Sequence, residues 1–308
     1  MKYAVTGAAG FIGSHLAEAL QVAGHGVVGI DSFTDYYDPA VKERNARAFE
    51  VRRLDLARDE LNFAGFDGVF HLAGQPGVRS FGDVFPLYVE RNVLASQRVF
   101  EAAAAAGARV VFASSSSIYG EAERYPTAEE VPPRPVSPYG ITKLACEHLA
   151  RAYATSFGLD AVVLRYFNAY GPRQRPDMAF PRILDALASG KPFALFGDGE
   201  QSRSFTYVAD VVAASVLAME RAPTRATYNV GGGEEATMNA TIALLESIAD
   251  RELDVRREEA VAGDQRRTKA DTTRIQTELG WQPETALAAG LRAQWEWAAT
   301  EREIESRA

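Results

Sequence analysis

The chain opens with Lys2-Tyr3-Ala4-Val5-Thr6-Gly7-Ala8-Ala9-Gly10-Phe11-Ile12-Gly13, in which an apolar run leads into three glycines spaced three apart. The run Lys2–Val5 predicts a β-strand, and the pattern Phe11–Ala23 predicts a helix. Glycines allow a tight turn and let the backbone approach a pyrophosphate, to which the first helical turn offers free N–H groups. The stretch therefore predicts a strand, turn and helix that bind a dinucleotide.

The alternation of strands and helices continues through the first half of the chain. Further strands are predicted at Gly26–Ile30, within Arg47–Leu54, and at Val69–Leu72, Arg109–Phe112 and Ala161–Leu164, with long helices at about Leu87–Ala106 and Tyr139–Phe157. Strands separated by helices of this length form βαβ units with right-handed crossovers. We therefore expect an α/β fold built on a doubly wound, Rossmann-like parallel sheet.

The end of the second predicted strand carries a carboxylate, Asp31. A carboxylate there accepts hydrogen bonds from both ribose hydroxyls of an adenosine and repels a 2′-phosphate, so Asp31 favours NAD over NADP. Asp55 follows the next strand, where it would flank the adenine or form a surface turn. His71 ends a buried strand and is more typical of a packed strand residue than of a catalytic group.

The pattern changes after about Asn168, where loops marked by glycine and proline interrupt shorter elements. We expect residues 1–168 to form the NAD-binding domain, with 205–225 returning to it. Residues 169–204 and 226–308 would form a smaller, interleaved α/β lobe that binds substrate. No low-complexity linker separates the two parts.

Composition excludes several classes of function. The 308 residues include 33 Lys and Arg against 41 Asp and Glu, a formal net charge of −8, which makes the chain a poor binder of nucleic acid or of an anionic membrane. One cysteine excludes a disulfide framework and a cysteine-rich zinc site, and we expect no metal. Neither a secretory signal nor a run of about 20 apolar residues is evident, so we expect a cytoplasmic protein.

A cluster of hydroxyls and a Tyr–Lys pair suggest chemistry. Ser114-Ser115-Ser116-Ser117 follow a predicted strand, at the end where ligands bind in open α/β sheets. Tyr139 and Lys143 lie four apart on a predicted helix and so share a face. An ammonium beside a phenol favours the phenolate, which would let Tyr139 act as a general base.

Together these motifs resemble the extended short-chain dehydrogenases/reductases of the nucleotide-sugar epimerase and dehydratase group. The resemblance rests on Thr6–Gly13, Asp31, His71–Gly74, Ser114–Gly120, Ser137–Lys143, Leu164–Pro172 and Arg203–Asp210. It implies that Tyr139 is the base, Lys143 its partner and anchor for the nicotinamide ribose, and Ser115 a helper hydroxyl. It also implies a homodimer formed through the helices at Leu87–Ala106 and Tyr139–Phe157.

The resemblance also narrows the reaction. Members share removal of a proton from the sugar 4-hydroxyl while hydride passes from C4 to NAD. Dehydratases carry Asp-Glu where this chain has Ser116 and Ser117, and glucuronate decarboxylases usually carry Glu at the second position. The remaining reaction is return of the hydride to the opposite face of the 4-keto sugar, which is 4-epimerisation of a UDP-sugar.

Fewer residues indicate which sugar is the substrate than indicate the reaction. Asp35–Pro39 and Arg175–Ala179 look like segments of UDP-glucuronate 4-epimerases, and the Arg175 guanidinium suits a carboxylate. Asn168, however, stands where that group often has Thr, which favours a UDP-glucose or UDP-N-acetylhexosamine 4-epimerase. We expect first that the protein converts UDP-glucuronate to UDP-galacturonate. A non-catalytic NAD-binding protein is the remote alternative.

The candidate residues are therefore as follows. The expected cofactor contacts are Gly7, Gly10, Phe11, Ile12, Gly13, Asp31, Ser32, Asp55, Leu56, Leu72, Ala73, Gly74, Asn92, Tyr139, Lys143 and Tyr166. The expected substrate contacts are Arg79, Ser115, Ser116, Ser117, Tyr139, Asn168, Arg175, Arg203 and Arg266. For Arg175 and Arg266, a charge exposed to solvent is the alternative.

Overall fold

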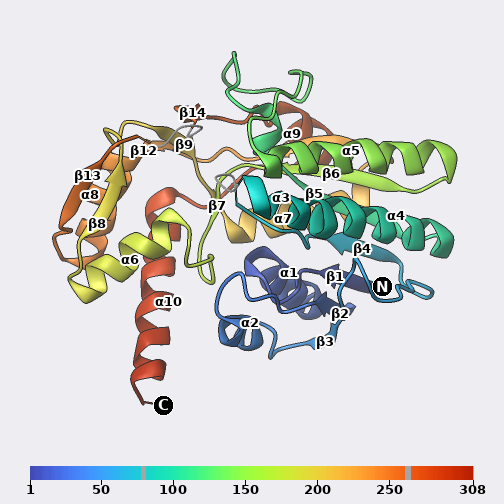
Figure 1. Cartoon of the computed structure of the whole chain (residues 1–308), viewed down its shortest axis with the longest axis horizontal. Helices are drawn as coiled ribbons and strands as arrows, with labels where there is room; N and C mark the ends of the chain where they lie inside the picture. The colour runs from blue at the N-terminus through green and yellow to red at the C-terminus, as the bar shows by residue number, and fades with distance from the viewer. Residues whose placement is uncertain (78–80, 261–264, 308) are drawn as a thin grey trace.

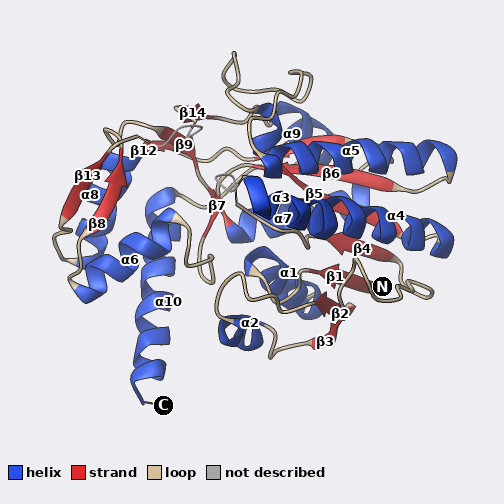
Figure 2. Ribbon diagram, in the orientation of Figure 1, coloured by secondary structure: helices blue, strands red, loops and turns tan. Residues whose placement is uncertain are grey.

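The computed structural model describes residues 1–77, 81–260 and 265–307, and its largest element is a seven-stranded parallel sheet (Figures 1 and 2). The strand order is β11-β6-β5-β4-β1-β2-β3. The strands are β1 (Lys2–Thr6), β2 (Gly26–Asp31), β3 (Glu50–Arg53), β4 (Gly68–His71), β5 (Arg109–Ser115), β6 (Ala161–Tyr166) and β11 (Thr227–Val230). Each neighbouring pair is parallel, which confirms the predicted doubly wound, Rossmann-like sheet.

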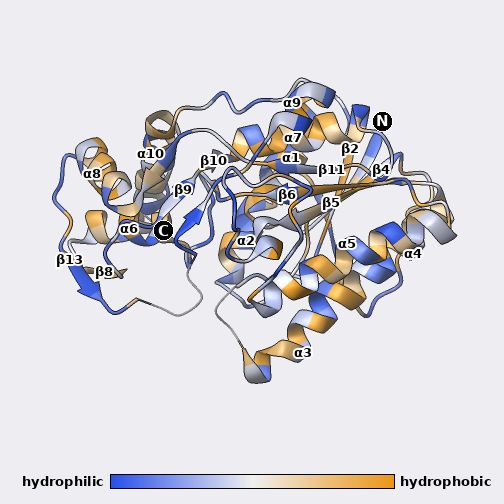
Figure 3. Ribbon diagram, turned by 90° about the horizontal axis from the view of Figure 1, so that it is seen from above, coloured by the Kyte–Doolittle hydropathy of each residue, from blue (hydrophilic) through white to orange (hydrophobic). Residues whose placement is uncertain are grey.

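Helices cover both faces of this sheet (Figure 3). α1 (Phe11–Val22), α7 (Val208–Arg221) and α9 (Thr273–Leu279) pack on one face, and α4 (Ala95–Ala106) and α5 (Pro138–Ser156) pack on the other. Side chains along a strand alternate between faces, so Val5 and its neighbour Ala4 join separate cores. A short helix, α2 (Pro39–Asn45), follows β2. Within the described part of the chain, no helix is long and apolar enough to cross a bilayer.

The long helix predicted at Leu87–Ala106 is not regular. It consists of α3 (Phe85–Tyr88), a π-helical stretch at Val89–Leu94, and α4, and it follows a 3₁₀ turn at Gly82–Val84. π-helical turns occur frequently at functional sites. Here the turn buries Asn92, whose Nδ2 donates to Thr142 Oγ1 on α5 at 3.0 Å.

Other segments of the second half of the chain form a smaller lobe that is interleaved with the large sheet, as the sequence predicts. α6 (Ala179–Ser189), α8 (Met238–Ala249) and α10 (Leu287–Arg307) share a core that includes Ile183, Leu245 and Leu291. Its short strands are β7 (Ala169–Tyr170), β8 (Phe193–Phe196), β9 (Ser202–Ser204), β10 (Thr206–Tyr207), β12 (Glu235–Thr237), β13 (Val255–Glu258) and β14 (Arg267–Thr268). β8 pairs with β13, β7 with β10, and β9 lies between β12 and β14.

One expected boundary is wrong. Residues 226–308 were all assigned to the smaller lobe, but β11 is the edge strand of the large sheet, with Tyr228 paired to Leu164 of β6. Ile275 and Leu279 of α9 belong to the same core as Tyr228. The helix at 208–221 followed by a buried strand continues the βαβ pattern, so the signal was present in the sequence. The other boundaries remain predictions.

Candidate active site

A cavity of about 720 Å³ lies at the carboxyl ends of the sheet strands and extends into the smaller lobe. Among the residues that line it, Gly7 follows β1, Asp31 ends β2, Ser115 ends β5 and Tyr166 ends β6, whereas Phe196 comes from the smaller lobe. The strand order reverses between β1 and β4, at the middle of this edge. Ligands of open α/β sheets bind at such a switch point.

Most of the predicted site residues line this one cavity. They are Gly7, Gly10, Phe11, Ile12, Gly13, Asp31, Ser32, Asp55, Leu56, Leu72, Ala73, Gly74, Ser115, Ser116, Ser117, Tyr139, Lys143, Tyr166, Asn168, Arg175 and Arg203. The chain therefore brings residues from distant segments, as far apart as Gly7 and Arg203, to the same space.

The glycine loop is packed closely against the turn after β4 and against itself. Gly7 has φ +68°, and a Cβ there would lie 2.8 Å from Ala73 N in the turn after β4. A Cβ on Gly13 would lie 2.1 Å from Gly7 O. Neither position has room for a larger side chain, so the first turn of α1 stays close to β1, and its orphan N–H groups remain beside the cavity. This cradle fits a pyrophosphate.

Asp31 is fixed at the edge of the cavity by two backbone donors. Its Oδ2 accepts from Ala9 N at 3.0 Å and its Oδ1 accepts from Phe33 N at 2.8 Å. Burial raises the pKa of the carboxyl, while the Phe33 N–H and the Lys42 ammonium act in the opposite direction. A carboxylate at this position, together with the glycine cradle, fits the adenosine and pyrophosphate of NAD.

Helix α5 carries the predicted base and its partner. The helix begins after Ser137, whose Oγ accepts from Gly140 N at 3.1 Å, with Pro138 at the first helical position. Tyr139 lies in the first turn and Lys143 one turn later. The buried Lys143 Nζ donates to Ala113 O of β5 at 2.8 Å and lies 5.9 Å from the centre of the Tyr139 ring. The phenol and the ammonium thus face the cavity from one helix face.

The serines after β5 form the first turn of a 3₁₀ helix, Ser116–Tyr119. Ser115 caps it, because its Oγ accepts from Ser117 N at 3.1 Å. The same Oγ donates to Ser117 Oγ at 3.1 Å. The positions that hold acids in dehydratases therefore present hydroxyls to the cavity here.

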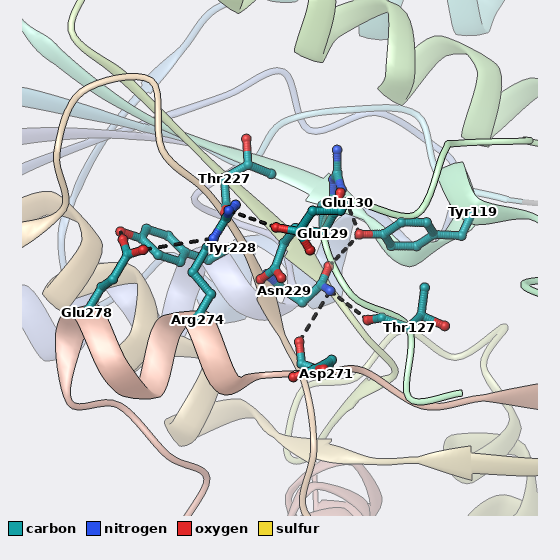
Figure 4. A network of polar contacts seen from close by, with 11 residues as sticks. Tyr119, Thr127, Glu129, Glu130, Thr227, Tyr228, Asn229, Asp271, Arg274 and Glu278 are labelled. Carbon is teal, nitrogen blue, oxygen red and sulfur yellow. Dashed lines mark hydrogen bonds and ion pairs between the residues drawn. The ribbon is translucent and has the colours of Figure 1, made fainter. Parts of the chain in front are cut away.

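A buried polar network braces the other end of this 3₁₀ helix (Figure 4). Tyr119 OH donates to Asn229 Oδ1 at 2.8 Å, and Arg165 Nη1 donates to Tyr119 OH at 2.6 Å. Asn229 Nδ2 in turn donates to Thr127 O at 2.9 Å. Burial raises the pKa of Tyr119 to about 12, so the phenol stays protonated and can donate. The network ties the serine turn to β6 and β11.

Three further predicted residues reach the cavity from the segments after β6. Arg203 Nη1 donates to Ser202 O at 2.8 Å. Asn168 Nδ2 donates to Ser204 O at 3.1 Å and to Thr268 Oγ1 at 2.7 Å. Arg175 forms an ion pair with Asp177, with 3.0 Å between Nε and Oδ1.

Comparison with known proteins agrees with this geometry. Residues 3–231 match the model of the NAD dependent epimerase/dehydratase family. The chain belongs to that family. The prediction of an NAD-dependent nucleotide-sugar 4-epimerase of the short-chain dehydrogenase/reductase type, with NAD as cofactor, is confirmed at this level.

Relatives within the family differ in their sugars. A Bacillus subtilis protein named uncharacterized UDP-glucose epimerase YtcB is 40% identical over 303 residues, 94% of this chain and 96% of that one. UDP-glucuronic acid 4-epimerase from Bacillus cereus, in complex with UDP-glucuronic acid and NAD, superposes with a TM-score of 0.94 at 38% identity, covering 98% and 100% of the two chains. UDP-glucose 4-epimerase from Thermotoga maritima, with UDP-glucose, gives 0.89 at 32% identity, covering 98% and 100%.

Some residues predicted to contact cofactor or substrate do not line the cavity. Arg266 does not line the cavity, because its exposed side chain forms an ion pair with Asp198 at 2.8 Å. Asn92 also lies behind the lining, where its Oδ1 accepts from Gln75 N at 2.6 Å. Gln75 itself lines the cavity. Arg79 lies outside the described residues.

Other lining residues were not singled out from the sequence. They include Gln75, Arg91, Phe196, Gln201 and Gln265. Phe196 ends a short apolar run, and its position before the turn at 197–199 is the signal that was available. Gln265 precedes Arg266, and no charge or motif marks it.

His71 is buried, as the sequence predicts, and so is the one cysteine. His71 Nδ1 lies 2.7 Å from Thr6 Oγ1, and its Nε2 lies 2.9 Å from Ser96 Oγ. Burial, with a smaller contribution from Lys143, lowers the pKa of His71 to about 3, so the ring is neutral. Cys146 is a buried free thiol in the core between α5 and the sheet.

Proposed function

We propose that the chain epimerises UDP-glucuronate to UDP-galacturonate at C4. The observation that carries the proposal is Arg175, which lines the same cavity as Tyr139 and the serine turn. A guanidinium presents a planar fork that matches a carboxylate, and the serine hydroxyls add donors. The Bacillus cereus relative, solved with UDP-glucuronic acid and NAD, supports this sugar.

In the proposed reaction, Tyr139 removes the proton from the sugar 4-hydroxyl and later returns one. Lys143 stabilises the phenolate by its charge and holds its own position through Ala113 O. The Ser115 hydroxyl, whose hydrogen points to Ser117 Oγ without substrate, would rotate to donate a hydrogen bond to the oxygen at C4. NAD, when bound against the glycine loop and Asp31, supplies the hydride acceptor and donor at C4.

Epimerisation is favoured over elimination by the serine turn. A dehydratase needs an acid that protonates the leaving hydroxyl, and a hydroxyl side chain does not ionise near neutral pH. Ser116 and Ser117 occupy those positions. The 4-keto sugar is then reduced again by the hydride, and rotation of the sugar between the two hydride transfers presents its opposite face and inverts C4. Loss of CO2 from this β-keto acid is the competing reaction, and the Glu that decarboxylases usually carry is Ser117 here.

A UDP-glucose 4-epimerase is the second candidate, and Asn168 favours it. Both amide hydrogens of Asn168 are used, since Nδ2 donates to Ser204 O and to Thr268 Oγ1. Ser204 O accepts only, so it fixes the orientation of the amide. Within the described part of the chain, Asn168 Oδ1 has no donor, and an acceptor suits a sugar hydroxyl better than a carboxylate.

We further propose a cytoplasmic homodimer, as expected from the sequence. Phe85 of α3 and Val89 and Leu94 of the π-helical stretch are spaced by four and five residues, and each is about 40% exposed or more. Ile141 of α5 is 49% exposed. A contiguous apolar surface on two neighbouring helices typically marks a protein interface.

A substrate panel tests the proposed function. UDP-glucuronate, UDP-glucose and UDP-N-acetylglucosamine are incubated separately with the purified enzyme, and the products are identified by NMR from their anomeric protons. We expect UDP-galacturonate to form with a kcat/KM at least about tenfold above those of the neutral sugars, which corresponds to about 1.4 kcal/mol. Turnover of UDP-glucose without turnover of UDP-glucuronate would support the second candidate instead.

A further inference from the structure

A contact joins the two sides of the cavity at its rim. Tyr36 lies in the loop after β2, five residues beyond Asp31, and thus on the cofactor side. Asp177 lies in the loop between β7 and α6, on the substrate side. Tyr36 OH donates to Asp177 Oδ2 at 3.2 Å, and both residues line the cavity. A loop of the large sheet therefore reaches the segment that carries Arg175.

Asp177 holds Arg175 by a two-point contact. Arg175 Nε donates to Asp177 Oδ1 at 3.0 Å, and Nη2 donates to Oδ2 at 3.1 Å. Nη2 also lies 3.3 Å from Met178 Sδ. Paired contacts of this kind fix the plane of the guanidinium as well as its position.

The ring of Tyr36 packs beside the same guanidinium. The distance from Arg175 Cζ to the centre of the ring is 5.8 Å, within the range of a cation–π contact. Tyr36 thus touches Arg175 with its ring and Asp177 with its hydroxyl. In the described residues, the Nη1 group of Arg175 makes no hydrogen bond, so this edge of the fork is left for a ligand.

The charges of the cluster are stable at neutral pH. Burial raises the pKa of Asp177, but the hydrogen bonds and charge of Arg175, followed by the Tyr36 hydroxyl, lower it more, so the net pKa lies below its usual range. Burial lowers the pKa of Arg175, but the bonds to Asp177 outweigh it. Asp177 therefore remains an anion that can orient the guanidinium.

We propose that Asp177 and Tyr36 are positioning residues that hold Arg175 for the carboxylate of a hexuronate substrate. The inference rests on the proposed function, because it requires that Arg175 contacts that carboxylate. An unrestrained arginine has many rotamers, and ordering it on binding would weaken affinity. A loop on the cofactor side would then contribute to selectivity for a charged sugar.

The inference predicts an effect on binding rather than on chemistry. Asp177 and Tyr36 act on the end of the sugar that carries the carboxylate, whereas the proton and hydride move at C4. Their loss should therefore raise the KM for UDP-glucuronate and leave its kcat nearly unchanged. The dissociation constant of UDP-glucose, which has no carboxylate, should stay nearly constant.

The test uses four single variants of the full chain, together with the two double variants that add Asp177→Asn or Tyr36→Phe to Arg175→Ala. Arg175→Ala removes the guanidinium, Asp177→Asn removes the anionic fork, and Tyr36→Phe removes only the hydroxyl. Asp185→Asn is the matched control, because Asp185 forms an ion pair with Arg302 at 3.0 Å outside the cavity. KM and kcat are measured with UDP-glucuronate, and the dissociation constant of UDP-glucose is measured by calorimetry.

We expect graded increases in the KM for UDP-glucuronate. Loss of a hydrogen bond to a charged group should give a factor of about 10 or more in Asp177→Asn, and loss of the Tyr36 hydroxyl a factor of about 3. The control should stay within about twofold, as is usual for surface substitutions. In an Arg175→Ala background, Asp177→Asn and Tyr36→Phe should add nothing further, since they act through Arg175.

The outcomes separate the two proposals. If Arg175→Ala raises the KM for UDP-glucuronate alone, while Asp177→Asn and Tyr36→Phe change nothing, the positioning role is overturned and the proposed function stands. If Arg175→Ala affects both sugars alike or neither, the assignment of the carboxylate contact fails, and the positioning role fails with it. If Asp177→Asn and Tyr36→Phe raise the KM for UDP-glucuronate by the same factors with and without Arg175, their role is merely structural. That result would also overturn the inference.

Discussion

Tyr139 carries the proposed proton transfer, and its removal is the simplest test at the scale of single residues. Tyr139→Phe keeps the ring on α5 but removes the only atom that can exchange a proton. We expect kcat to fall by a factor of about 10² to 10⁴, the usual contribution of a general acid–base. The bound fraction of NAD, measured by absorbance after denaturation, should stay unchanged.

Tyr125→Phe is the control for this variant, because Tyr125 does not line the cavity. It should retain full turnover. Full turnover by Tyr139→Phe would overturn the assignment of Tyr139 as the base.

His71 makes stability depend on pH. Its pKa is about 3 in the folded state, mainly because of burial, against about 6.5 in an unfolded chain. Between these values the unfolded chain binds more protons, so His71 lowers the free energy of unfolding as the pH falls below about 6.5. From pH 6 to pH 5, we expect about 1 kcal/mol more loss in wild type than in His71→Gln. Urea unfolding at pH 6 and pH 5 measures the free energy of unfolding of wild type and of His71→Gln. The same pH dependence in the two proteins would contradict a neutral, buried His71 ring.

The residues that could be predicted from sequence are those whose role follows from local spacing. Gly7, Asp31 and the pair of Tyr139 and Lys143 depend on neighbours within one turn or one strand, and the structure brings them to the cavity. Arg266 does not reach the cavity as expected, because its side chain is held by Asp198. Asp198 is 68 residues away, and no local pattern of the sequence shows that contact. The same reason hid the contact between Tyr36 and Asp177.

At the scale of elements, the glycine loop makes a sharp prediction. A Cβ on Gly13 would lie 2.1 Å from Gly7 O, so Gly13→Ala must push α1 away from β1. We expect a lower melting temperature and loss of bound NAD. Gly26→Ala, where the nearest atom to a Cβ is Lys2 Cγ at 3.6 Å, should retain both. Calorimetry and the NAD content of the purified variants provide the comparison, and an unchanged Gly13→Ala protein would refute the close approach.

Helices and strands with a sustained hydrophobic pattern could be predicted from the sequence. Those whose conformation or position depends on tertiary packing were predicted less well. β1 and α5 follow from plain patterns. The π-helical stretch at Val89–Leu94 inserts an extra residue into a turn so that Asn92 reaches Gln75 and Thr142, and propensity alone does not show this. β11 has only four residues, and its place beside β6 is settled by packing across the sheet.

At the scale of the whole molecule, the proposed dimer can be tested by charge substitution. Leu94→Glu and Ile141→Glu would each place a charge in the apolar surface on the π-helical stretch and α5, where burying it is costly. We expect both to halve the mass measured by light scattering. Val22→Glu, at a position 90% exposed on the end of α1, is the control and should leave the mass unchanged. A wild-type monomer would contradict the proposal.

The net charge of −8 also gains meaning at this scale. The chain as a whole repels polyanions, yet the cavity that would receive two anionic ligands gathers the glycine-loop N–H groups with Lys143, Arg175 and Arg203. Binding of these ligands depends on this local arrangement and not on the overall charge.

The fate of the hydrogen at C4 tests the central claim most directly. UDP-glucuronate carrying deuterium at C4 is incubated with the enzyme, and the product is analysed by NMR and mass spectrometry. Because C4 would lose and regain the same hydride without release of the intermediate, we expect UDP-galacturonate that retains deuterium at C4, with no net accumulation of NADH. Product that has exchanged the label with solvent, or unchanged UDP-glucuronate, would contradict the account.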